Sequence, residues 1–285
     1  MKKTIFTAVL LMLTALIYAG GASAPANNTE QADVHFDRGL EFFNQFNLDS
    51  AIAEFTEAIR LDPNNRYAYE YRAEAYYDKG DYDRAIADYT QLIRLEPDEL
   101  EYYLNRGYMY YLIADDDHAI ADYTHILRIE PNEVIAYNLR GDAYSGKGEY
   151  DRAIADYTQA IRLDPDDLEH YYDRGMAYHR INDYDRAIAD YTQVIQLAPD
   201  YAEAYNNRGA AYNGKGDYDR AIADLTESIR LYPDGYANPY RHRAYAYMQK
   251  GSFAQARADV NKALQINPNY EDALTLSADL QQRGY

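Results

Sequence analysis

Residues 150–165 read YDRAIADYTQAIRLDP, and close variants of this stretch recur along most of the chain, as at residues 82–97 and 184–199. Its proline belongs to a series at positions 63, 97, 131, 165, 199, 233 and 268, in which five intervals are 34 residues and the last is 35. A fixed period of this length is typical of solenoids, in which one supersecondary unit repeats and stacks. The spacing therefore predicts a repeat protein of seven units.

Each unit contains two stretches with apolar residues at helical spacing, which predicts a pair of amphipathic helices. With the proline of each unit at position 32, small residues occupy positions 8 and 20, as Gly141 and Ala153 do in the fourth unit. Large aromatic residues occupy positions 4, 11 and 24, as Tyr137, Tyr144 and Tyr157 do there. Because small residues let two helices approach while the rings fill the space beside them, each unit is expected to form a helical hairpin.

A glycine followed by an acidic residue stands between the two helices of several units, as at 80–81, 148–149 and 216–217. Glycine adopts the backbone conformation that ends a helix, and an acidic side chain can cap the next one. We therefore expect Gly148 to end a first helix and Glu149 to cap the second.

The order of aromatic, Gly or Ala, aromatic, Ala, aromatic and Pro resembles the tetratricopeptide repeat (TPR) pattern, W-x2-L-G-x2-Y…A-x3-F…P. The resemblance extends over residues 32–268. It implies an all-α fold, a right-handed superhelical solenoid of TPR helix–turn–helix hairpins. Residues 269–285 fit a C-terminal capping helix, with Leu274, Leu276 and Leu280 available to cover the last hairpin. The expected repeats are 32–65, 66–99, 100–133, 134–167, 168–201, 202–236 and 237–268.

The first 24 residues have the composition of a secretory signal peptide. Lys2 and Lys3 precede an apolar run, and Ala22-Ser23-Ala24 supplies small residues at a cleavage site. The run is short for a membrane span, which favours cleavage near Ala24 over an uncleaved anchor. The mature protein is then expected to be periplasmic or secreted, with residues 25–31 as a linker and no stable membrane insertion.

Composition and motifs exclude several classes of function. The net charge of −19 opposes nucleic-acid binding, which depends on basic residues, and the absence of cysteine removes disulfides and thiolate nucleophiles. No histidine spacing matches a metal site or a catalytic arrangement, so no cofactor, metal or enzyme activity is expected. The acidic run at residues 115–117, followed by His118, could hold a cation, although capping of a helix explains it as well. A metal-dependent melting temperature would reveal such a site.

Position 7 of every unit is arginine where the TPR pattern has leucine, and position 23 is acidic in every unit. A charge in a packed hairpin persists only if it is paired. We therefore expect one ion pair between the two helices of each hairpin. The five central pairs are Arg72–Asp88, Arg106–Asp122, Arg140–Asp156, Arg174–Asp190 and Arg208–Asp224; Arg38 and Glu54 occupy these positions in the first unit, and Arg243 and Asp259 in the last.

In the family that the chain resembles, the first helix of each hairpin lines a concave groove that holds peptide segments. Carried over to this sequence, the groove positions are rich in tyrosine and acid. The tyrosines are Tyr67, Tyr71, Tyr77, Tyr108, Tyr111, Tyr172 and Tyr245; the acids are Asp33, Asp37, Glu70, Glu74, Asp78, Glu101, Asp142, Glu169, Asp173 and Glu203; Arg180 and Arg241 are the basic residues, and Asn207 stands at a clamp-like position.

The family's carboxylate clamp for acidic C-terminal peptides is not matched around Asn207, because Tyr172, Met176, Asn238 and His242 depart from it. Aromatic anchors amid negative charge instead suit a basic or aromatic-bearing peptide or protein surface. The sequence thus predicts a monomeric, exported, non-enzymatic scaffold for protein–protein interaction. The alternatives are acids that merely face solvent, and a structural protein that self-associates through its exposed ends or convex face.

Overall fold

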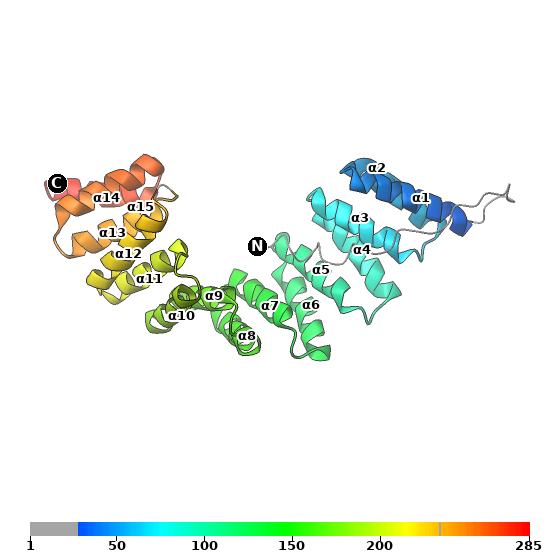
Figure 1. Cartoon of the computed structure of the whole chain (residues 1–285), viewed down its shortest axis with the longest axis horizontal. Coiled ribbons are helices and arrows are strands. Elements are labelled where there is room, and N and C mark those ends of the chain that lie inside the picture. Colours follow the sequence, from blue (N-terminus) through cyan, green and yellow to red (C-terminus); the bar gives the residue numbers. More distant parts are fainter. Residues whose placement is uncertain (1–27, 234) are drawn as a thin grey trace. The chain divides into compact units, whose positions relative to one another are not determined.

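The computed structural model describes residues 28–233 and 235–285, in which helices follow one another and pack as consecutive pairs (Figure 1). This confirms the predicted all-α solenoid of helical hairpins. The fifteen helices of the described residues are α1 (Asn28–Asn44), α2 (Leu48–Leu61), α3 (Arg66–Asp78), α4 (Tyr82–Leu95), α5 (Leu100–Leu112), α6 (Asp116–Ile129), α7 (Val134–Gly146), α8 (Tyr150–Leu163), α9 (Leu168–Arg180), α10 (Tyr184–Leu197), α11 (Ala202–Lys215), α12 (Tyr218–Leu231), α13 (Asn238–Gln249), α14 (Phe253–Ile266) and α15 (Glu271–Gln282).

The described residues divide into two compact units, one up to residue 68 and the other from residue 69 onward. The first contains the hairpin of α1 and α2, in which the fully buried ring of Phe55 packs 5.8 Å from Phe36. The predicted signal peptide lies outside the described residues. Residues 28–31, assigned to a linker, instead form the start of α1, where Glu30 is favourably placed near the helix N-terminus. Of the helices within residues 28–233 and 235–285, none has the length and hydropathy to cross a membrane.

The turn between the two helices of a hairpin requires a left-handed residue. At Gly148, with φ of 75°, the amide donates to the carbonyl of Ser145 at 3.0 Å, and the next amide donates to that of Tyr144 at 2.8 Å. Three hairpins place other residues here, with φ values of 59° at Phe46, 58° at Ala114 and 61° at Asn182. Since such residues pay a steric cost at positive φ, helix packing imposes the turn even without glycine.

The second helices α4, α6, α8, α10 and α12 begin after an acidic residue, and these acids do not all act in the same way. The side chains of Asp81 and Asp217 accept a hydrogen bond from the amide three residues further on, which satisfies a free donor of the helix. The expected cap by Glu149 is wrong, because its side chain makes no capping hydrogen bond. The longer glutamate instead accepts from Arg152 Nη1 at 2.8 Å.

The core of each hairpin is built where a small residue faces a large one. In the fourth hairpin Ala153 is fully buried, and a Cβ added to Gly141 would lie 2.7 Å from a ring carbon of Tyr157. The ring of Tyr157 itself is 2% exposed. Glycine at this position lets the ring of Tyr157 approach closely, and any side chain there would have to displace the ring.

Helix α15 ends the solenoid. Leu280 is fully buried and Leu276 packs against the same cluster as Val260 and Met248. The expectation that Leu274 also covers the last hairpin is wrong, because that side chain is 47% exposed. The buried face runs through Ala273, Leu276 and Leu280, and helical geometry turns the neighbouring position toward solvent.

Candidate functional site

The arginine of each central hairpin joins its two helices. In the fourth hairpin Arg140 on α7 donates from Nε and Nη2 to the two carboxylate oxygens of Asp156 on α8, both at 2.8 Å. The remaining Nη1 donates to Thr124 Oγ1 of the preceding hairpin at 3.0 Å. Burial lowers the pKa of Arg140, but the hydrogen bonds to Asp156, together with the charge of Asp156 and the two neighbouring tyrosines, hold the pKa above its ordinary value. The guanidinium therefore stays charged and ties three helices together.

The same bidentate contact occurs in five further hairpins. The arginine also lies between two tyrosines of its own helix, with Arg140 Cζ 5.8 Å from the ring centroid of Tyr137 and 6.0 Å from that of Tyr144. The other bidentate pairs are Arg72–Asp88, Arg106–Asp122, Arg174–Asp190, Arg208–Asp224 and Arg243–Asp259.

The first hairpin departs from this arrangement. Its acid is Glu54, and His35 Nδ1 lies 2.6 Å from one carboxylate oxygen, whereas Arg38 Nη2 lies 3.7 Å from it. The glutamate side chain is longer than aspartate and reaches the histidine on the preceding helical turn. In the hairpin of α1 and α2, Glu54 therefore contacts His35 more closely than it contacts Arg38.

Three predicted groove tyrosines form a connected group on α3 and α5. The ring centroids of Tyr77 and Tyr108 are 6.4 Å apart, and those of Tyr108 and Tyr111 are also 6.4 Å apart with the rings nearly parallel. All three are partly exposed. We call Tyr77, Tyr108 and Tyr111 the tyrosine cluster; it presents aromatic surface on two successive first helices.

Acidic residues of α3 lie on the same helix as this cluster. Burial, reinforced by the charge of Asp78, raises the pKa of Glu74 to about 7. Burial also raises the pKa of Asp78, and burial followed by the charges of Glu74 and Glu70 raises that of Tyr71. No basic side chain among the described residues pairs with Glu74. Burial therefore disfavours the ionised forms of the Glu74 and Asp78 carboxyl groups on α3.

The raised pKa of Glu74 predicts a pH-dependent effect of Glu74→Gln. A carboxyl group whose folded-state pKa exceeds its unfolded value stabilises the fold below the unfolded pKa, and this contribution is lost as pH rises through the folded pKa. The shift from 4.5 to about 7 means that the ionised side chain destabilises the fold at pH 8. Glu74→Gln should therefore raise the free energy of unfolding by about 3 kcal/mol at pH 8 and leave it unchanged at pH 4.

Urea denaturation at both pH values measures this difference. The matched control is Glu101→Gln, which changes an exposed glutamate on the next first helix and should shift stability by less than about 0.5 kcal/mol at either pH. Equal effects of Glu74→Gln at pH 4 and pH 8 would show that Glu74 titrates as an ordinary surface glutamate.

Asp142 on the first helix α7 contacts a buried tyrosine of the second helix α8, Tyr157. It accepts a hydrogen bond from the hydroxyl of Tyr157 at 2.9 Å. The equivalent ring one hairpin earlier, Tyr123, is fully buried and its hydroxyl has no hydrogen-bond partner among the described residues. Burial, followed by the charge of Asp142, raises the pKa of both hydroxyl groups, so both tyrosines keep their hydroxyl proton.

Tyr172 and Asn207, toward the C-terminal end, form a separate pair. Asn207 Nδ2 donates to the hydroxyl of Tyr172 at 3.0 Å, and its Oδ1 accepts from Asn206 at 2.9 Å. The ring of Tyr172 packs edge-on against Tyr201, with centroids 5.4 Å apart. Burial, with the charges of Glu169 and Glu203, raises the pKa of Tyr201 to about 12. Negative charge thus surrounds this pair too.

Three other predicted groove residues have partners outside these groups. Arg241 forms an ion pair with Asp272 of α15 and donates to the hydroxyl of Tyr270 at 3.3 Å, so its guanidinium is engaged within the protein. Tyr245 packs edge-on against Tyr218 with centroids 6.3 Å apart. Tyr67 belongs to the other compact unit, where the Arg66 guanidinium lies 4.3 Å above its ring.

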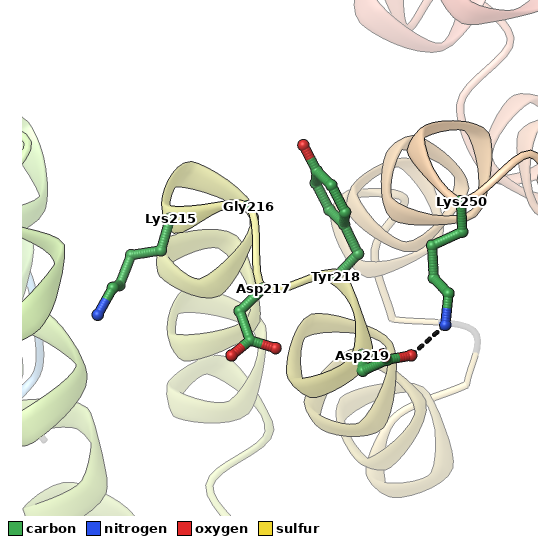
Figure 2. Close-up of a pocket in the computed structure, with 6 residues that line it drawn as sticks. All are labelled: Lys215, Gly216, Asp217, Tyr218, Asp219 and Lys250. Carbon is green, nitrogen blue, oxygen red and sulfur yellow. Dashed lines mark hydrogen bonds and ion pairs between the residues drawn. The ribbon is translucent and has the colours of Figure 1, made fainter.

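The pocket in Figure 2 lies at the turn between the two helices of one hairpin, α11 and α12, beside the end of α13, and is lined by Lys215, Gly216, Asp217, Tyr218, Asp219 and Lys250. Lys250 forms an ion pair with Asp219, drawn as a dashed line in Figure 2. Similar pairs join Lys147 to Asp117 and Lys215 to Asp185. Because these aspartates are highly exposed, the ion pairs contribute little stability. The pocket is therefore one instance of a polar turn that recurs along the chain, and we do not assign it as a binding site.

The acidic run at residues 115–117 is occupied by contacts within the protein. Asp115 accepts hydrogen bonds from the amide of His118 at 3.4 Å and from its Nδ1 at 2.8 Å, and Asp117 pairs with Lys147. Asp164, Asp167 and His170 form a different group, which the spacing of the histidines alone does not predict. The signal was present as an Asp-x-x-His sequence at the start of a helix.

Comparison with protein families identifies the repeats. Family models described as "TPR repeat" match residues 73–113 and 141–182, and models described as "Tetratricopeptide repeat" match residues 36–89, 172–236, 100–133 and 237–270. Together these matches leave only residues 134–140 unmatched between 36 and 270. A search of curated proteins finds no match.

Solved structures share the fold. The crystal structure of MamA is 29% identical over 59% of this chain and 92% of its own, with a TM-score of 0.56. The C-terminal part of a TPR repeat-containing protein from Cytophaga hutchinsonii is 22% identical over 85% of this chain and 98% of its own, with a TM-score of 0.69. YrrB, described as a TPR protein with an unusual peptide-binding site, is 20% identical over 67% of this chain and 97% of its own, with a TM-score of 0.57. Its repeated hairpins and these family matches show that the chain belongs to the tetratricopeptide repeat proteins.

Proposed function

We propose that this protein is an exported, non-enzymatic scaffold whose first helices bind a basic, aromatic-bearing segment of another protein. TPR proteins generally act as scaffolds for protein–protein interaction. The binding surface that we assign is the face of α3, α5 and α7 that carries the tyrosine cluster together with Glu74, Asp78 and Asp142. Export rests on the signal-peptide pattern of residues 1–24.

The observation that carries the proposal is the environment of Glu74. Its pKa of about 7 reflects a partly buried carboxylate beside the charge of Asp78, and no described basic side chain pairs with it. A lysine or arginine of a partner would supply the missing positive charge and favour the ionised form. The surface is thus electrostatically complementary to a cationic ligand.

Several arginines of the second helices pair with an acid at the start or end of the same helix, as Arg84 does with Asp81, Arg186 with Asp183 and Arg230 with Glu227. On the first helix α3, by contrast, the charge of Asp78 acts on Glu74, and Tyr77 of the same helix belongs to the tyrosine cluster. Aromatic rings of this kind anchor protein interfaces.

The tyrosine cluster supports a partner that itself carries aromatic or extended apolar groups. Rings whose centroids lie 6.4 Å apart form a continuous aromatic surface, against which a ring of the partner can pack edge-on or offset. The likeness to YrrB shows the fold alone, so the chemistry of the ligand is argued from the residues of this chain.

The test measures binding of short fluorescent peptides to residues 25–285 by anisotropy. One peptide alternates Lys or Arg with Phe or Tyr; a second has Glu in place of each basic residue, and a third has Ala in place of each ring. We expect saturable binding of the first, weakened by salt, and at least about tenfold weaker binding of the others. Tyr108→Ala combined with Glu74→Gln should weaken binding of the first peptide by at least about tenfold.

The matched control changes one exposed tyrosine and one exposed acid away from the first helices, as Tyr232→Ala with Asp151→Asn. It should bind the first peptide as the wild type does. Equal loss in both double variants, or equal binding of the basic and acidic peptides, would refute the assigned face. Light scattering during the same experiment would reveal self-association, which would favour the structural alternative.

A further inference from the structure

Three potential metal ligands meet at the turn between α8 and α9. Asp164 ends α8, Asp167 precedes α9 and His170 lies in the first turn of α9. One ligand atom from each of them can be chosen so that all lie within 4.8 Å of one another. Acidic turns occur between other hairpins, but a histidine completes the group here.

The imidazole of His170 is buried and held in one orientation. The residue is 5% exposed, and Nδ1 lies 3.0 Å from Asn138 Oδ1 on α7. Because an amide oxygen can only accept, Nδ1 carries the proton in this hydrogen bond. Nε2 then holds a lone pair in the neutral ring, and it is buried without a hydrogen-bond partner among the described residues. Its nearest acidic atom is Asp167 Oδ2, at 3.8 Å.

The same place two hairpins earlier shows how the fold satisfies such a group. Tyr102 stands at the equivalent repeat position and is 4% exposed. Its hydroxyl donates to Glu70, which corresponds to Asn138, and lies 3.3 Å from Glu96, which corresponds to Asp164. There the protein supplies both partners. At His170 the inner partner is present and the outer one is left open.

The two carboxylates are placed to complete coordination. Asp167 uses Oδ1 to accept from the amide of Glu169 at 2.9 Å, which leaves Oδ2 facing the histidine. Asp164 Oδ1 accepts from the amide of Asp166 at 3.4 Å, and both aspartates reach the surface. Exposed side chains can close in on an ion, whereas the buried imidazole is already fixed.

The geometry points to a binding site for a divalent transition-metal ion of the Zn²⁺ class, with Asp164, Asp167 and His170 Nε2 as ligands. An imidazole with two carboxylates is a donor set that Zn²⁺ accepts, with a water molecule as the fourth ligand. Ca²⁺ and Mg²⁺ prefer oxygen ligands throughout, so they gain nothing from His170. Metal-binding histidines are typically oriented by a hydrogen bond from their other ring nitrogen, and His170 Nδ1 makes this bond to Asn138. The ion would join α8 to α9 between consecutive repeats.

Calorimetric titration of metal-free residues 25–285 with ZnCl2 tests the site. We expect one saturable site, lost in His170→Ala and at least about tenfold weaker in Asp167→Asn and Asp164→Asn. These changes respect the fold: alanine is the native residue at this repeat position in Ala136 and Ala204, and asparagine caps a helix as well as aspartate does. Asp200→Asn, which removes one charge at the next equivalent turn, should bind Zn²⁺ as the wild type does.

A second readout identifies the ligand directly. Zinc binding should shift the ¹⁵N resonance of His170 Nε2 among the six histidines of the chain and leave that of Nδ1 protonated. Unchanged zinc affinity in His170→Ala, or no saturable binding by the wild type below about 1 mM, would overturn the proposal. So would a titration in which Mg²⁺ displaces Zn²⁺ at equal concentration, because that would indicate general attraction to an acidic surface.

Discussion

Replacing Arg140 by leucine is expected to lower the free energy of unfolding by about 3–5 kcal/mol. The change leaves the carboxylate of Asp156, whose side chain is 8% exposed, without either of its hydrogen bonds from Arg140. It also removes the hydrogen bond to Thr124 that joins consecutive hairpins. A buried charge without a partner is among the costliest defects in a packed interior. Urea denaturation followed by circular dichroism measures the loss.

The double variant Arg140→Leu with Asp156→Leu separates the cost of a broken pair from the value of the pair. A buried ion pair contributes little net stability relative to apolar residues of similar volume. The double variant should therefore recover most of the loss. Arg152→Leu, which changes an exposed arginine of the same hairpin, should cost less than about 1 kcal/mol. If the single and double variants unfolded at the same urea concentration, the charge of Asp156 would not be the cause.

Replacing Tyr157 by alanine is the second change with a large expected effect, about 3–5 kcal/mol of stability. The ring is 2% exposed and fills the space that Gly141 leaves between α7 and α8. Truncation opens a cavity at a point where neither backbone can follow without breaking the Arg140–Asp156 contact. The same urea denaturation detects it.

Tyr157→Phe separates the ring from its hydroxyl. This variant keeps the packing and removes only the hydrogen bond to Asp142 at 2.9 Å, so about 1 kcal/mol is expected. Leucine, which stands at the equivalent position in the sixth hairpin as Leu225, should give an intermediate cost. Equal costs for phenylalanine and alanine would assign the stability to the hydrogen bond and not to the ring.

The fold class was accessible from sequence because repetition multiplies a weak signal. A single unit offers two short amphipathic stretches, but the same small residues and rings recur in phase, as Gly107 with Tyr123 and Gly141 with Tyr157. Two local roles were less accessible, because Glu149 precedes a second helix as the other acids do yet does not cap it, and Leu274 lies in the last helix yet faces solvent. Their positions depend on neighbouring charges and on the exact face that a helix turns inward.

The candidate binding face could be predicted only in part. The pattern places tyrosines and acids on first helices, but it does not distinguish a residue that is already engaged from one that is available. Arg241 was assigned to the groove, and its pairing with Asp272 of α15 depends on how the last helix packs. The raised pKa of Glu74 likewise results from burial that the sequence does not contain.

The sequence by itself determined the repeat length, the helical hairpins, the acidic character of the chain and the periodic placement of arginine, tyrosine and glycine. These follow from local spacing, because each unit repeats the same short-range geometry. Only the tertiary structure decided which polar side chains of neighbouring hairpins contact each other. Arg140 reaches Thr124, and Asn138 fixes the imidazole of His170 beside two aspartates, because stacking brings together residues that are 16 and 32 positions apart. Contacts between repeats depend on the angle and register of stacking, which local periodicity leaves open.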